Sequence, residues 1–495
     1  MRVCSFRFLV SVSASFALCW SAQAGPWVAP GDMALRHDIQ TLADAGVIKA
    51  PVTSWPLSWG DVLNDIADYR DPEGLSDAES EALLRVRRIG SQATRRRIIQ
   101  AEIDAHYDTE PGLLRGFEDR AREDTDIAVS AGWLGDRFAA EIVVNGVSSP
   151  DDDQDVRLDG SYVGVAIGNY MVSAGAMERW WGPGYDGSII LGNNQRPIPA
   201  ISIERNDTAP FKSKWLSWLG HWDASFVWGQ LENERAVPNA RFLGLRLNFK
   251  PLDSLEIGLS RTAQWCGSGD RPCDLDTLVK LAIGRDNLGD EGVDIANEPG
   301  NQLAGVDVRW SPKFAPLNGA AYLQLIGEDE AGGLPSRFLG QLGFEVAGVY
   351  RDLNYRAFAE YAGTACQFYE DSSRPNCGYN SLTYETGYRY KGRSIGHSAD
   401  NDAEVLSVGA VIAERDGDVW QVVLRDASLN TEGEPDFRNT ISSVPAEYSA
   451  LEISYRKEFA GGLLELGGGL SRFEDNVTGE SNNDSRLFIG WRMPF

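Results

Sequence analysis

The stretch I-Q-A-E-I-D-A-H-Y-D, residues 99–108, alternates apolar and polar side chains over its whole length. Successive residues of an extended strand point to opposite sides, so Ile99 and Ile103 share one face while Glu102 and Asp104 share the other. A charged face is unsuited to the core of a β-sandwich, but it suits a barrel with lipid outside and a polar lumen inside. The stretch therefore predicts the first strand of a transmembrane β-barrel.

The same alternation returns along the rest of the chain, at 241–249, at 451–456 and at 486–495. The last of these stretches ends in Phe495, and a final strand with a terminal phenylalanine resembles the assembly signal of bacterial outer-membrane barrels. We therefore expect the barrel-assembly machinery and outer-membrane lipid as partners of the chain, and the bacterial outer membrane as its location.

The connections between these stretches alternate in length. Short ones occur at 135–136, 168–169, 251–253, 351–352, 416–417 and 461–462, and long polar ones near 109–125, 148–156, 266–301, 364–378, 429–445 and 474–484. Outer-membrane barrels have short periplasmic turns and long extracellular loops. We predict an all-β antiparallel barrel over residues 97–495, whose length fits about 16 to 20 strands, an even number. Whether 198–206 and 379–395 cross the membrane stays open.

A helical region is expected before the barrel, at residues 25–96, because its apolar residues follow a helical spacing. Helix caps are predicted at Asp32 and at Ser76, which with Glu79 forms a capping box. We expect this region to plug the periplasmic end of the barrel. The basic residues Arg95–Arg97 would then dock against the inward acids Glu102 and Asp104.

Residues 1–24 have the basic start, apolar middle and small-residue cleavage site of a secretory signal peptide. Its removal leaves four of the six cysteines, which lie in two close pairs, Cys266 with Cys273 and Cys366 with Cys377. In an oxidising compartment, this spacing predicts two local disulfides in extracellular loops, with zinc binding as the alternative. The net charge of −26 makes nucleic acid an unfavourable partner, and no later run of 18 apolar residues predicts a membrane helix.

Residues 177–222 are dense in side chains that bind sugars, with a central part that reads M-E-R-W-W-G-P-G-Y-D-G-S-I-I-L-G-N-N-Q-R-P-I-P (177–199). Aromatic rings stack on the apolar faces of sugars, while carboxylates, amides and guanidinium groups bind hydroxyls. With the loop around 391–402, this segment supplies the candidate polysaccharide-binding residues at the outer end of the barrel: Arg179, Trp180, Trp181, Asp186, Asn193, Asn194, Arg196, Trp215, Trp218, Arg393 and His397. The alternative is a tryptophan-rich loop that folds back and fills the barrel mouth.

Two other patterns are weaker. Ser394, Ser398 and Asp400 lie near His397, but catalytic triads are assembled from separate elements rather than from one short loop. The acidic run 151–155 would suit loose Ca²⁺ bridging, yet it lacks the glycine and the glutamate of an EF-hand loop. We therefore expect no catalysis, no cofactor and no metal site, and a solvated loop at 151–155.

Four segments resemble the capsule assembly protein Wzi family of Gram-negative bacteria. They are residues 26–48, E-R-W-W-G-P-G-Y-D-G-S at 178–188, W-L-S-W-L-G at 215–220 and G-Y-R-Y-K-G-R-S-I-G-H-S-A-D-N-D at 387–402. The resemblance covers nearly the whole mature chain, and it implies an 18-stranded outer-membrane barrel with a periplasmic helical bundle closing one end. It also implies a lectin-like role, in which the barrel attaches long-chain capsular polysaccharide to the cell surface.

We therefore predict an outer-membrane protein that attaches capsular or other surface polysaccharide non-covalently. The alternatives are a porin or an accessory channel for polysaccharide export, and, less favoured by the residues, a barrel enzyme such as a lipid-A deacylase or a protease. The helices at 25–96 argue against a diffusion pore. If they plug the barrel, removing them is expected to raise its conductance.

Overall fold

The computed structural model describes residues 25–71, 74–118, 120–269, 271–283, 300–314, 317–331, 334–370, 374–431 and 436–495. The predicted signal peptide, residues 1–24, lies outside this set, so its cleavage stays a prediction. Among the described residues, no helix is both long enough and apolar enough to cross a membrane.

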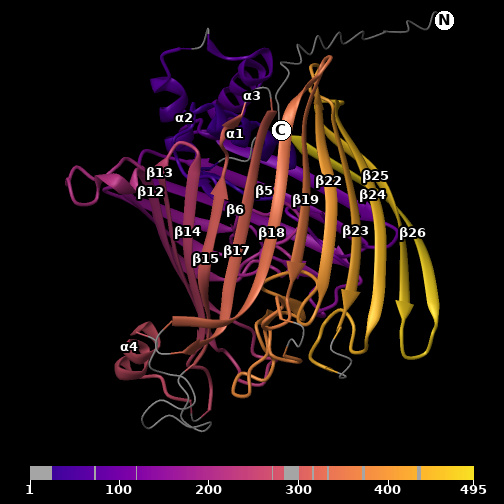
Figure 1. Cartoon of the computed structure of the whole chain (residues 1–495). Helices are drawn as coiled ribbons and strands as arrows, with labels where there is room; N and C mark the ends of the chain where they lie inside the picture. Colours follow the sequence, from indigo (N-terminus) through magenta and orange to yellow (C-terminus); the bar gives the residue numbers. More distant parts are fainter. Residues whose placement is uncertain are drawn as a thin grey trace, which may run out of the picture.

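A closed antiparallel barrel of 18 crossing strands forms the body of the chain, as far as the described residues show it (Figure 1). The crossing strands are β4 (Ile99–Asp108), β5 (Thr125–Leu134), β6 (Phe138–Ser148), β8 (Tyr162–Ile167), β9 (Tyr170–Gly175), β11 (Ala200–Arg205), β12 (His221–Gln230), β13 (Arg241–Leu252), β14 (Leu255–Trp265), β15 (Gly300–Trp310), β17 (Leu317–Ala331), β18 (Leu334–Tyr350), β19 (Leu353–Gly363), β22 (Glu404–Glu414), β23 (Val419–Leu429), β24 (Ala446–Phe459), β25 (Gly462–Asp475) and β26 (Ser481–Pro494). The ring is closed by β26, which pairs with β4. The predicted fold class is confirmed.

Shorter elements complete the described chain. They are β7 (Val156–Arg157) and β16 (Lys313–Phe314) in the barrel sheet, the pair β1 (Trp27–Val28) and β3 (Leu57–Ser58), the pair β2 (Ser54–Trp55) and β10 (Trp180–Trp181), the pair β20 (Arg389–Tyr390) and β21 (Arg393–Ser394), the 3-10 turn η2 (Ser217–Leu219) and the helix α4 (Leu275–Ile283). Of the two stretches that the sequence left open, 198–206 contains the crossing strand β11, whereas 379–395 does not cross and carries the small hairpin β20–β21.

The two ends of the barrel differ in their connections. Tight turns join strands at one end, at 135–137, 168–169, 253–254, 351–352 and 460–461, and long loops join them at the other. Because outer-membrane barrels keep their short turns in the periplasm, the tight-turn end is the periplasmic end. Helices α1 (Met33–Ala45), α2 (Trp59–Asp68) and α3 (Asp77–Ala93) lie at this end, together with the C-terminus (Figure 1).

Helix α1 is fastened to the inner side of the barrel wall by buried ion pairs. Its Asp44 accepts hydrogen bonds from Arg309 of β15, at 2.7 Å, and from Arg356 of β19, at 3.3 Å. Both arginines also contact the buried Glu345 of β18. The predicted caps are present as well, since Asp32 caps α1 and Ser76 caps α3 in a full capping box.

The predicted docking of Arg95–Arg97 is wrong. Arg96 and Arg97 both pair with Asp136, in the exposed turn between β5 and β6. The lumenal acids Glu102 and Asp104 pair instead with Arg492 of the neighbouring strand β26. The three arginines follow α3 directly and precede β4, so they lie at the rim of the barrel rather than inside it.

The alternation that predicted the strands is present in space. On β4 the side chains of Ile99 and Tyr107 are exposed on the outer wall, while Asp108 is buried in the lumen. On β13 Leu245 faces outward, and Arg246 is buried inside, paired with Asp307 of β15. The apolar face is therefore the lipid-facing face throughout these strands.

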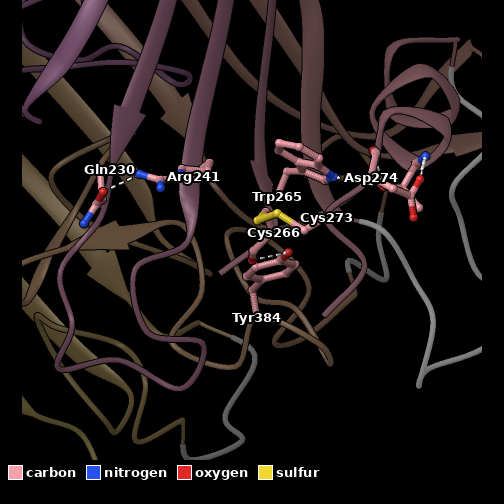
Figure 2. The surroundings of a disulfide bond; sticks show 8 residues. Gln230, Arg241, Trp265, Cys266, Cys273, Asp274 and Tyr384 are labelled. Atoms are coloured by element: carbon pink, nitrogen blue, oxygen red, sulfur yellow. Dashed lines mark hydrogen bonds between the residues drawn. A yellow bond between two sulfur atoms is a disulfide. The ribbon is translucent and has the colours of Figure 1, made fainter. Parts of the chain in front are cut away.

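Both predicted cysteine pairs are disulfide-bonded, Cys266 with Cys273 and Cys366 with Cys377. Figure 2 shows the first of them next to Trp265, at the outer end of β14. The hydroxyl of Tyr384, from the loop that follows β19, donates a 3.1 Å hydrogen bond to the carbonyl oxygen of Cys266. Each bridge therefore constrains a loop at the outer end, as the spacing predicted.

Replacing Cys366 and Cys377 by alanine is expected to loosen the outer loop 364–378 and to leave the barrel assembled. The bridge closes a short loop outside the strand ladder, so its loss acts on the loop rather than on the ladder. Limited proteolysis should cut the variant within 367–376, while its heat-modifiable migration on a gel stays that of the unaltered protein. Loss of the folded band would contradict this prediction, as would free thiols in the unaltered protein.

Candidate functional site

The segment 176–199, which follows β9, turns into the barrel instead of projecting from it. Its strand β10 pairs antiparallel with β2 of the N-terminal region, with Trp180 opposite Trp55. The ring of Phe117 lies between these two tryptophans, 5.1 Å from Trp55 and 5.4 Å from Trp180, centre to centre. Trp180 and Trp181 are both 1% exposed. They are core residues in this structure, with no open face for a sugar ring.

Backbone turns set the path of this segment. Gly182 has a φ of +144° and donates its N–H to the carbonyl oxygen of Thr53, at 2.9 Å. A side chain at Gly184 would meet the carbonyl oxygen of Gly187 at 2.2 Å, so only glycine fits there. Gly182 and Pro183 therefore lie in a bend of the backbone.

A buried carboxylate on the wall holds the turn in place. Glu360 of β19 accepts hydrogen bonds from the backbone N–H groups of Tyr185 and Asp186, the second at 2.9 Å. Tyr322 and Gln341 donate to the same carboxylate, at 2.6 Å and 2.8 Å. The segment is thus bound to the wall through its main chain.

Asp186 is bound to the wall as well, through its side chain. Arg425 of β23 donates to both carboxylate oxygens, with Nη2 2.6 Å from Oδ1 and Nε 3.0 Å from Oδ2. Ser407 of β22 donates to Oδ2. Both partners of the ion pair are buried. Asp186 therefore has a structural partner rather than a free carboxylate.

His397 is buried beside this site, and burial lowers its pKa to about 4. Its Nδ1 accepts the backbone N–H of Ala399 at 3.2 Å. The imidazole is therefore neutral at neutral pH, and it accepts a hydrogen bond from its own loop. None of Ser394, Ser398 and Asp400 is hydrogen-bonded to the ring among the described contacts.

The remaining polar candidates form hydrogen bonds or ion pairs with other residues of the protein. Asn193 donates to the carbonyl oxygen of Phe117 at 2.9 Å, and Asn194 donates to that of Ser394 at 3.3 Å. Arg179 pairs with Glu204 of β11 at 3.4 Å. These three side chains are buried, so the structure brings them together as the filling of the lumen.

The acidic run 151–155 is largely exposed, as expected of a solvated loop, but three arginines also pair with it, Arg157 and Arg196 with Asp152 and Arg393 with Asp151. Arg196 donates to Asp159 at 2.7 Å and also contacts Asp152. Burial lowers the pKa of Arg196, but these carboxylates more than offset it and hold the pKa above its usual value. Arg393 donates to Asp151 at 2.7 Å. No group of three or more histidine, cysteine or acidic residues in the described chain is arranged to hold a metal.

Trp215 and Trp218 are placed at the other end of the molecule, which corrects the predicted outer site. They lie in the connection 206–220 between β11 and β12, which contacts α2 through a 3.3 Å hydrogen bond from the Thr208 N–H to Asp61. Counting the strands shows why. Strand β11 (200–205) crosses the membrane from the outer end, so the residues that follow it lie at the periplasmic end.

The outer end presents a different aromatic residue, which the sequence reasoning missed. Phe437 is 90% exposed, and it stands between Asp436 and Arg438 in the loop that follows β23. We name residues 380–382 and 436–440 the outer platform, because Asn380 donates to Asp436 at 2.7 Å and joins the two segments. Leu382, also exposed, belongs to it. In the sequence, the mixture of Asp, Phe, Arg and Asn at 436–439 is the feature that could have indicated a sugar-binding surface.

The outer platform is hydrogen-bonded to a buried ion pair, Arg389 with Asp400. Arg389 donates to both carboxylate oxygens of Asp400, at 2.8 Å and 2.7 Å, and Asp400 accepts the Thr440 N–H at 2.8 Å. Arg438 donates to Asp436 at 2.9 Å. Burial raises the pKa of Asp436, but the bonds from Arg438 more than offset it, so the carboxyl stays ionised at neutral pH. An exposed aromatic ring can stack on the apolar face of a sugar, and a guanidinium group in the same loop can pair with an acidic substituent of the glycan.

Comparison with known proteins identifies relatives of this chain. A 55.8 kDa protein of Klebsiella pneumoniae, described as uncharacterized and located in the cps region, is 33% identical over 317 residues, which are 62% of this chain and 60% of that relative's length. The solved structure of Wzi from Escherichia coli, described as a carbohydrate-binding β-barrel involved in group 1 capsule assembly, is 25% identical and aligns with a TM-score of 0.80. That alignment covers 95% of this chain and all of the other. The family model for the capsule assembly protein Wzi matches residues 107–486, and the chain therefore belongs to this family.

Proposed function

We propose that the protein attaches capsular or other surface polysaccharide non-covalently to the outer membrane, and that the outer platform is its binding surface. The observation that carries the proposal is Phe437, an aromatic ring that is 90% exposed in a loop bound through Thr440 to the buried ion pair of Arg389 and Asp400. The family membership of the chain and its likeness to the Escherichia coli carbohydrate-binding barrel support this function. An aromatic ring kept in water at such exposure favours a ligand with apolar C–H faces.

The ligand best suited to this surface is an acidic polysaccharide. The chain carries a net charge of −26, so an acidic glycan needs a local cation to approach it. Arg438 supplies one at the outer platform. Arg393, paired with the 66% exposed Asp151, is a second candidate contact at the outer end. A long glycan with many repeats gains avidity from several weak contacts of this kind.

The buried candidates have a supporting role in this proposal. Trp180, Trp181 and Asp186 close the lumen beneath the outer platform. A closed lumen suits a surface anchor better than a porin. We propose no catalytic role, because the Asp186 carboxylate and the backbone N–H groups of Tyr185 and Asp186 are already bound to the wall.

Replacing Phe437 and Arg438 by alanine is expected to release polysaccharide from the cell without lowering its total amount. Loss of one aromatic contact, about 0.5–1.5 kcal/mol, should weaken binding of a short oligosaccharide about two- to tenfold. Cell-bound and shed polysaccharide should be measured together with calorimetric binding to the purified barrel. Tyr369→Ala, an exposed aromatic at the outer end but outside the platform, is the matched control.

Unchanged retention and unchanged oligosaccharide binding in the double variant would remove the outer platform from the site. A fall in total polysaccharide, with normal retention of what is made, would instead favour an accessory role in export.

A further inference from the structure

The connection 206–220 carries apolar side chains into solvent at the periplasmic end. Trp215 is 87% exposed and Trp218 is 61% exposed, and Leu216 between them is exposed too. The exposed Lys212 and Lys214 precede them. The other connections at this end are mostly tight turns, so a long one with this composition calls for an explanation.

This connection folds back along the outer side of the barrel wall. Phe211 stacks on Trp222 of β12, with ring centres 4.4 Å apart and planes 10° apart. Trp218 lies edge-on to Phe249 of β13, at 6.2 Å. Trp222 and Phe249 are paired across the two strands on the lipid-facing side, because their neighbour Asn248 is buried in the lumen.

Two polar contacts hold the connection in this position. The guanidinium of Arg205 lies 3.8 Å from the centre of the Trp222 ring, and its Nη2 donates to the carbonyl oxygen of Ala209 at 2.9 Å. Gly220 forms a bridge with Lys250, near the periplasmic end of β13. The segment therefore lies against the lipid-facing wall where that wall leaves the membrane.

We propose that residues 211–218 are an anchor in the inner leaflet of the outer membrane. Trp215, Leu216 and Trp218 insert among the phospholipid headgroups, where the apolar body and the polar N–H of tryptophan are both satisfied. Lys212 and Lys214 bind headgroup phosphates, because an anionic membrane surface attracts basic side chains. The occupant is phospholipid rather than lipopolysaccharide, because the segment is at the periplasmic end.

The anchor would fix the depth of the barrel at β11–β13. Its exposed apolar side chains continue the lipid-facing band formed by outward residues such as Leu245, so one lipid surface covers both. The inference rests on the membrane location of the barrel and not on polysaccharide binding. The test of the lipid anchor is therefore independent of whether the outer platform binds polysaccharide.

The test uses a fluorophore at Ser217→Cys in the full-length protein, reconstituted into vesicles of phosphatidylethanolamine and phosphatidylglycerol. Ser217 is exposed between the two tryptophans, so the label leaves the anchor residues in place. We expect strong quenching by a lipid with a spin label on its headgroup and little quenching by aqueous iodide. Leu245→Cys is the lipid-facing reference, and Val477→Cys, exposed in an outer loop, is the water-facing reference.

Replacing Trp215 and Trp218 by serine in the labelled protein should move the quenching toward that of the Val477 label. Lys212→Gln with Lys214→Gln should remove its dependence on phosphatidylglycerol content. Heat-modifiable migration confirms that each variant is folded. If the Ser217 label in the unaltered sequence is quenched by iodide as strongly as the Val477 label, the proposal is wrong, and a periplasmic protein becomes the expected occupant.

Discussion

In planar bilayers, deletion of residues 25–96 is expected to leave the barrel almost as closed as the intact protein. The sequence alone suggested that this deletion would open the lumen. The structure adds a second closure, because the segment 182–194 fills the barrel from the outer side. The two fillings meet where β2 pairs with β10.

The outer filling has its own attachments to the wall and to a neighbouring loop. Tyr379 donates to the carbonyl oxygen of Ile189 at 2.6 Å, and Tyr388 donates to that of Ile190 at 2.7 Å. The Tyr388 hydroxyl is also 2.9 Å from Thr262 of β14. None of these contacts involves residues 25–96, so we expect the outer filling to persist without them.

Deleting 25–96 and also replacing 182–194 by a short glycine-serine linker should raise the conductance about tenfold or more over either single change, because a polar lumen of this strand number then holds water. Replacing the exposed outer turn 476–480 by the same linker is the matched control, and it should change nothing. Porin-sized openings in the intact protein, or after deletion of 25–96 alone, would contradict two independent closures.

The sequence predicted the fold well because a barrel strand is a local pattern. Alternation over 99–108 identifies the strand, the sides of its residues and the lipid-facing band without knowledge of any partner. The alternation in connection length gave the orientation for the same reason. The cysteine pairs were predictable because each bridge joins residues that are close in sequence.

The candidate site was less predictable, because a polar lumen and a sugar surface use the same residue types. Trp180 pairs with Trp55, a residue far away in the chain, and nothing local to 177–199 indicates that partner. Arg196 and Arg393 likewise pair with acids of another loop. Trp215 is different. If residues 200–205 had been predicted to cross the membrane, the number of strands that precede Trp215 would have placed it at the periplasmic end.

Asp186→Ala is expected to destabilise the barrel by about 3–5 kcal/mol, the usual effect of leaving one member of a buried ion pair without its partner. Asp186 and Arg425 are each buried, and Nη2 of Arg425 lies 2.6 Å from Oδ1 of Asp186. The urea concentration at half-unfolding in detergent measures the change. Asp151→Ala is the matched control: its carboxylate is 2.7 Å from Arg393 but 66% exposed, so we expect a loss of at most about 1 kcal/mol.

A third variant separates the lost charge from the lost side chain. Asp186→Leu with Arg425→Met removes both charges and keeps apolar volume, so it should recover most of the stability that Asp186→Ala loses, because no buried charge is left without a partner. Since Asp186 joins the segment 182–194 to β23, the single variant should also free this segment and give brief openings in planar bilayers. Equal midpoints for Asp186→Ala and Asp151→Ala would mean that the buried pair does not hold the outer filling in place.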